Sequence, residues 1–133
     1  MKTIGIIAIL LFSPIVLADD DCLISGVFNI DTAKTMADFL EHHTITSPEE
    51  KRAWTEVFSS LSHEWRCDEM RGGNFGYEIP WQKVSVTQLE PHTLLVSFPE
   101  KRWPDLTLVF EGPCYKSYNS QMNFHDYFCP VEE

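Results

Sequence analysis

Short segments in which apolar and polar residues alternate fill the chain from His63 to Cys129, and they constrain its fold most strongly. A period of two is typical of β-strands that bury one face. Turn signals at Gly72-Gly73, Glu90-Pro91-His92 and Glu111-Gly112-Pro113 separate the segments, and Pro99–Asp105 forms a longer loop. This spacing predicts five to seven antiparallel strands in a curved meander. The alternating apolar residues are Trp65 and Cys67; Phe75, Tyr77, Ile79 and Trp81; Val84 and Val86; Leu94, Val96 and Phe98; and Leu106, Leu108 and Phe110.

Two helical patterns precede the strands. Asp31 is placed to cap the first helix, which ends near His42-His43 and whose predicted apolar stripe is Ala33, Met36, Ala37 and Leu40. Ser47-Pro48-Glu49-Glu50 is a start signal for the second, because Ser caps, Pro suits the first helical position and Glu50 completes a capping box. Its apolar face is Trp54, Val57, Phe58 and Leu61. We therefore expect an α+β fold, with two N-terminal helices packed on the curved antiparallel sheet or plugging one end of it.

The first 18 residues have the pattern of a signal peptide. Lys2 precedes an apolar run, and Val-Leu-Ala at 16–18 stands directly before three aspartates. Cleavage after Ala18 would leave residues 19–133 as a single disulfide-bonded domain, exported to the periplasm or secreted. A lipid anchor needs a cysteine directly after the cleavage site, and three aspartates separate Ala18 from Cys22. The sequence therefore predicts no membrane anchor.

Four cysteines lie after the leader, and an even count in an exported chain predicts two disulfides. The segments 114–118 and 124–129 can pair as a hairpin around 119–123, which sets residue 118 opposite 125 and 114 opposite 129. Directly opposite residues are close enough to be bridged. The pattern thus predicts Cys114–Cys129 from the hairpin register and Cys22–Cys67 by elimination.

The segment Gly26-Val27-Phe28-Asn29-Ile30-Asp31 resembles the opening of a group of small exported bacterial proteins of uncharacterised function. In that group a Gly-x-aromatic-x-hydrophobic-Asp strand enters a helix, and a second helix and a strand meander follow. This chain has Phe28 where tryptophan is usual, and it has no lipobox. The resemblance implies the fold and a bacterial periplasmic setting, and it transfers no functional residue.

The net charge of the chain limits the classes of molecule that it is expected to bind. The formal net charge is −10, and loss of Lys2 with the leader makes it −11. Nucleic acids and anionic membranes need a basic footprint, so neither is an expected partner. A basic protein partner suits this charge better.

No sequence motif for catalysis, a cofactor or a metal is present, and we predict that the protein is not an enzyme. The paired histidines His42-His43 diverge by about 100° on a helix and do not chelate alone. The acids Glu64, Asp68 and Glu69 leave a small hydrolase as a third alternative, which would require a cleft and a desolvated carboxyl group.

The loop Pro99–Asp105 is the predicted binding segment. Arg102 and Trp103 belong to the residue types enriched at binding hot spots, and bounding prolines stiffen the loop. Glu100, Lys101 and Asp105 complete the predicted partner-binding set. The function expected first is a protein-binding module, such as an inhibitor or immunity protein that neutralises a toxin or cell-wall hydrolase. In the opposing interpretation, Trp103 folds back onto the sheet.

A second function is a small apolar-ligand carrier. A strongly curved sheet can close on a pocket, and the predicted lining is Phe75, Tyr77, Trp81 and Phe110. A visible pocket would favour the carrier, whereas a filled core with an exposed acidic patch would favour the protein-binding module.

Overall fold

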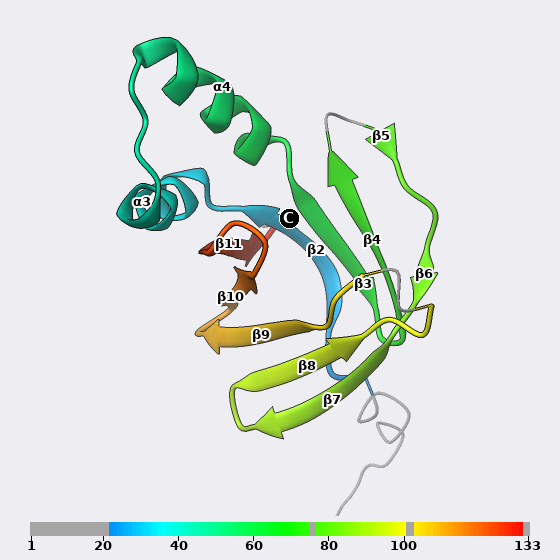
Figure 1. Cartoon of the computed structure of the whole chain (residues 1–133). Coiled ribbons are helices and arrows are strands. Elements are labelled where there is room, and N and C mark those ends of the chain that lie inside the picture. The colour runs from blue at the N-terminus through cyan, green and yellow to red at the C-terminus, as the bar shows by residue number, and fades with distance from the viewer. Residues whose placement is uncertain (1–21, 75–76, 101–102, 132–133) are drawn as a thin grey trace, which may run out of the picture.

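The computed structural model describes residues 22–74, 77–100 and 103–131. The predicted leader, residues 1–18, lies outside them. Within these ranges the chain forms two helices and ten strands (Figure 1). The strands are β2 (Ser25–Ile30), β3 (Ser62–Arg66), β4 (Glu69–Asn74), β5 (Tyr77–Glu78), β6 (Gln82–Lys83), β7 (Ser85–Glu90), β8 (Thr93–Ser97), β9 (Leu106–Glu111), β10 (Cys114–Asn119) and β11 (Phe124–Pro130).

Both helices begin at the predicted caps. The Asp31 side chain accepts a hydrogen bond from the Lys34 backbone N–H at the start of α3 (Thr32–His42). Ser47 accepts one from the Glu50 N–H at the start of α4 (Pro48–Ser59), where Pro48 is the first residue. Each cap satisfies a backbone donor that has no partner within its helix.

The sheet is larger than the predicted five to seven strands, and that expectation is wrong. Nine antiparallel strands follow one another in the order β5-β4-β3-β2-β11-β10-β9-β8-β7, and β6 pairs with β4 beside this path. The prediction read the segment around Cys67 as one strand and placed the turn at Gly72-Gly73. The chain instead reverses at Cys67, whose φ of 58° permits a tight turn, and both glycines lie inside β4.

The sheet closes nearly into a barrel. Only Val84 separates β6 from β7, so one run of chain pairs with β4 at its start and with β8 at its end. The Val84 N–H donates to the Asp68 carbonyl oxygen at 2.9 Å, which continues the pairing across the junction. The two ends of the strand path are thereby joined through this run (Figure 1), and closure of this kind leaves few unpaired sheet edges.

Two apolar clusters fill the fold. The larger lies inside the barrel, where inward residues of successive strands meet; its most buried members are Trp65, Val96, Leu108, Tyr115 and Phe128. The smaller joins both helices to the β10–β11 hairpin through Met36, Phe39, Phe58 and Phe124. The helices therefore pack on one side of the barrel, and the interior is left to the strands.

Cys22 pairs with Cys67 and Cys114 with Cys129, the same two pairs that the sequence predicts. The hairpin has the predicted register, with Tyr118 opposite His125. The first bond joins the segment before β2 to the β3–β4 turn. Disulfides persist in oxidising compartments, so the protein belongs to an extracellular or otherwise oxidising environment. Among the described helices, none has the length and apolar character needed to cross a membrane.

Candidate functional site

A cavity of about 320 Å³ opens at one end of the barrel. Its mouth consists of exposed residues from the loop before β9 and from the β10–β11 turn, namely Trp103, Pro104, Asp105, Tyr118, Ser120 and Gln121. Its floor includes the buried side chains Met70, Phe98 and Ser117 together with His63 and Gly72. The remaining wall is formed by Ile79, Gln82, Leu106, Asn119 and Asp126. The cavity therefore leads from solvent into the barrel interior.

Small inward-facing residues leave this space open. The layer of the barrel beside the cavity is filled by large side chains such as Trp65 and Tyr115. Two residues further along the same strand faces, β10 carries Ser117 and β4 carries Gly72 opposite His63. Because these residues are small, the opening extends from the exposed mouth down to the buried floor.

A chain of three polar side chains borders the floor. The Trp65 Nε1–H donates to the Tyr115 hydroxyl at 3.0 Å, and that hydroxyl lies 2.8 Å from His63 Nδ1. Burial lowers the pKa of His63 to about 4, so its ring is neutral at pH 7. The indole nitrogen only donates, so the Tyr115 hydroxyl accepts from Trp65 and shares a second hydrogen bond with His63 Nδ1.

Asp126 places a carboxyl group on the cavity wall. It lies on the inward face of β11, between the buried rings of Phe124 and Phe128. Its Oδ1 is buried and has no hydrogen-bond partner among the described residues. Burial, with a smaller contribution from the charge of Asp38, raises the pKa of Asp126 to about 6. A buried acceptor without a donor is costly, and among the buried side-chain nitrogen and oxygen atoms of the described residues Asp126 Oδ1 is the one without a partner.

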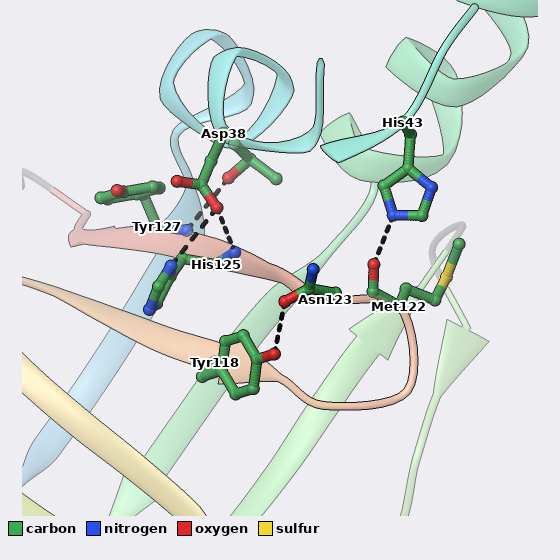
Figure 2. Close-up of polar contacts among 8 residues, drawn as sticks. Asp38, His43, Tyr118, Met122, Asn123, His125 and Tyr127 are labelled. Carbon is green, nitrogen blue, oxygen red and sulfur yellow. Dashed lines mark hydrogen bonds and ion pairs between the residues drawn. The ribbon is translucent and has the colours of Figure 1, made fainter. Parts of the chain in front are cut away.

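Helix α3 supports the cavity wall from outside. β2 pairs with β11 only from Phe128 onward, which leaves the N–H groups of His125 and Tyr127 without a strand partner. Asp38 Oδ2 accepts from the His125 N–H at 2.6 Å, and Thr35 Oγ1 accepts from the Tyr127 N–H at 3.0 Å. Figure 2 shows Asp38 reaching from α3 to this strand. Side chains of one helix thus complete the hydrogen bonding of a strand edge.

The β10–β11 turn, which forms part of the mouth, is held at two further points. The ring of His43 stacks on Phe39, and its Nε2 donates to the Met122 carbonyl oxygen. The Tyr118 hydroxyl donates to Asn123 Oδ1 at 2.5 Å (Figure 2). This side of the mouth is therefore a fixed wall.

The predicted binding loop meets the cavity in part. Trp103 and Asp105 line the mouth, and Trp103 is 52 % exposed. Trp103 therefore forms part of the mouth while about half of its surface stays exposed to solvent. Glu100 is exposed and does not line the cavity. Lys101 and Arg102 lie outside the described residues.

The lining predicted for a ligand carrier is wrong for both residues that can be placed. The ring of Trp81 lies against two guanidinium groups, with its centroid 3.7 Å from Arg66 Cζ and 4.6 Å from Arg71 Cζ. It does not line the cavity. Phe110 packs on Tyr115 in the apolar core, with ring centroids 5.3 Å apart. Phe75 and the side chain of Tyr77 lie outside the described part of the chain.

The acids that suggested a hydrolase do not converge on the cavity. Glu64 pairs with Arg71 at 2.9 Å, Asp68 with Lys83 at 3.3 Å, and Glu69 with Arg66 at 3.9 Å. Among the described residues, no group of three or more His, Cys, Asp or Glu side chains could hold a metal ion.

Asp126, His63 and Ser117 were not among the site residues predicted from the sequence. The available signal was strand phase: Asp126 shares its face with Phe124 and Phe128, and His63 shares its face with Trp65. A polar residue at an inward position of an apolar face marks either a bonded core group or a cavity.

Comparison of the chain with protein families, curated proteins and solved structures finds no match. Its function is therefore inferred from the cavity.

Proposed function

We propose that this protein binds a small, mainly apolar molecule in the barrel cavity. The observation that carries the proposal is an opening of about 320 Å³ that leads from exposed residues to a buried floor. Ligand pockets occupy roughly 300–1,000 Å³, favour the mouths of β-barrels and combine apolar walls with a few polar groups. Met70, Phe98 and Leu106 supply such walls here, and Asp126 and His63 supply polar groups.

The proposed setting is outside the cytoplasm. Residues 1–18 would direct export, and the periplasm is the compartment we favour over secretion. There the two disulfides would remain formed and keep the barrel and its cavity in shape. A carrier of this kind needs no catalytic group and no cofactor.

Filling the cavity tests this function. Ser117→Phe would place a ring in the space above the floor and should abolish binding of hexan-1-ol, which wild-type protein should bind with shifts of cavity amide signals in NMR titrations. Thr107→Phe is the matched control, because Thr107 is exposed on β9 beside the cavity residue Leu106. Thermal melts establish that both variants fold. If the cavity amide signals of the wild-type protein do not shift on addition of hexan-1-ol, the proposal is contradicted.

A second candidate is a protein-binding module that uses the Pro99–Asp105 loop against a basic partner, as an inhibitor or immunity protein would. The half-exposed ring of Trp103, next to Pro104, favours it, because exposed tryptophans are enriched among hot-spot residues. The chain's net charge of −10 would speed association with a basic protein.

Trp103→Ala should weaken this second interaction mainly by faster dissociation and should leave the melting temperature near the wild-type value. Wild-type and variant baits would be compared for capture from periplasmic extract, and the captured protein would then be purified for surface plasmon resonance at two salt concentrations. Added salt should slow association. A variant that melts many degrees lower would show instead that the ring stabilises the fold.

A further inference from the structure

The charges around the cavity select among ligands. Two carboxyl groups line it, Asp105 at the mouth and Asp126 on the wall, and the described lining contains no Lys or Arg. Its histidine, His63, is neutral at pH 7 because burial lowers its pKa to about 4. Along the described lining, a ligand carboxylate or phosphate would therefore meet acidic or neutral groups, whereas a cation would meet opposite charge.

Asp126 lacks the donor that a ligand could supply. Its buried Oδ1 has no partner among the described residues. Asp126 interacts electrostatically with Asp38 on α3 and Tyr115 on β10, and the other titratable groups of the described cavity lining are His63 and Asp105. None of these carries a positive charge at pH 7, so no described residue of the cavity lining neutralises the Asp126 carboxylate.

We infer that the cavity takes an organic amine, whose ammonium group donates a hydrogen bond to Asp126 Oδ1 while its apolar body lies against Met70, Phe98 and Leu106. The inference rests on the proposed function and specifies the ligand class. At about 30 Å³ for each water-sized group, the cavity has room for on the order of ten such groups. A charge-assisted hydrogen bond to a carboxylate is shorter and stronger than a neutral one, and it is strongest where water is excluded.

Three six-carbon probes with the same tail separate the possible head groups: hexylamine, hexan-1-ol and hexanoate. Dissociation constants would be measured at pH 8 by NMR titration of the full mature protein. Hexylamine should bind at least tenfold more tightly than hexan-1-ol, and hexanoate should not bind. Asp126→Asn should weaken hexylamine at least tenfold and hexan-1-ol less than threefold. Glu56→Gln, an exposed acid on α4 that does not line the cavity, is the matched control and should weaken hexylamine less than threefold.

The pH dependence of hexylamine binding provides an independent test of the role of Asp126. Since burial raises the pKa of Asp126 to about 6, the carboxyl group is largely neutral at pH 5. Hexylamine should then bind about tenfold more weakly than at pH 8, whereas hexan-1-ol should change little.

The outcomes distinguish the two proposals. If hexan-1-ol equals or exceeds hexylamine, or if Asp126→Asn leaves hexylamine unchanged, the amine inference is overturned and the ligand cavity stands. If none of the three probes shifts the cavity amides, both the inference and the proposed function are overturned.

Discussion

Replacing Phe39 with alanine is expected to lower the free energy of unfolding by about 3–5 kcal/mol, the usual cost of truncating a fully buried aromatic ring. Phe39 is 2 % exposed and lies at the centre of the helix-side cluster. Its ring centroid lies 4.9 Å from that of Trp54, 5.3 Å from Phe58 and 5.2 Å from Phe124. One truncation would thus remove the contact surface between α3, α4 and the β10–β11 hairpin.

Leu40→Ala is the matched control, because Leu40 is the next residue on the same helix and is 42 % exposed. It should cost less than about 1 kcal/mol, as exposed substitutions usually do. Urea unfolding followed by tryptophan fluorescence gives both values. Equal, small losses for the two variants would mean that α3 is not docked on the barrel in solution.

The loss at Phe39 should also reach the cavity. The same helix holds the outer edge of β11 through Thr35 and Asp38, and Asp126 belongs to that stretch of β11. The stacked ring of His43 fixes the turn at Met122. A helix that loosens would free these hydrogen-bonding groups, so the cavity wall depends on packing outside the barrel.

Local signals in the sequence predicted the elements that local physics determines. Asp31 and Ser47 cap their helices because a short polar side chain before an apolar pattern has a backbone donor within reach. The register of the last hairpin followed from a turn around residues 119–123, and that register set Cys114 opposite Cys129. Neither result depends on distant parts of the chain.

Long-range contacts decided what the sequence could not predict. The stripe predicted for the first helix is wrong in that Ala33, Ala37 and Leu40 are exposed. Thr35 is buried because its hydroxyl accepts a hydrogen bond from β11, a role invisible to apolar periodicity. Closure of the sheet likewise depends on β6 and β7 belonging to one run that pairs with two distant strands.

The cavity residues could be predicted from the sequence only in part. Strand phase places Asp126 inward, and this could be read from the sequence. That Asp126, His63 and Ser117 border one cavity depends on the curvature of the sheet and on the position of the loop before β9. The Pro99–Asp105 loop, part of which lines the mouth, was therefore predicted from the sequence, but the floor of the cavity was not.

The two titratable groups of the cavity should have opposite effects on stability below pH 7. The pKa of Asp126 is raised from 3.8 to about 6, so the folded state binds this proton more tightly than the unfolded state. Acidification through this window stabilises the fold by about 3 kcal/mol. The pKa of His63 is lowered from 6.5 to about 4, so the unfolded state takes up its proton first, and acidification destabilises the fold by a similar amount.

Single variants should expose each contribution. Relative to wild type, Asp126→Asn should lose roughly 2–3 kcal/mol of unfolding free energy between pH 7 and pH 4, because it lacks the stabilising protonation. His63→Gln should gain roughly the same amount, because it lacks the destabilising one. Thr107→Ser, an exposed substitution on β9 that changes no titratable group, is the control and should follow the wild-type curve. Urea titrations at five pH values give the free energy of unfolding of the wild type and the three variants.

The opposite effects of Asp126 and His63 on the pH dependence of stability have a consequence for ligand binding. A ligand ammonium group that holds Asp126 ionised would prevent its protonation. It would therefore remove the stabilisation that acid gives through Asp126 and leave the destabilisation through His63 unchanged. Acid should then destabilise the amine-bound protein more steeply than the free protein, through the remaining His63 term. Variants whose pH curves all run parallel to wild type would show that neither group is buried in solution, and the cavity floor would then be open to water.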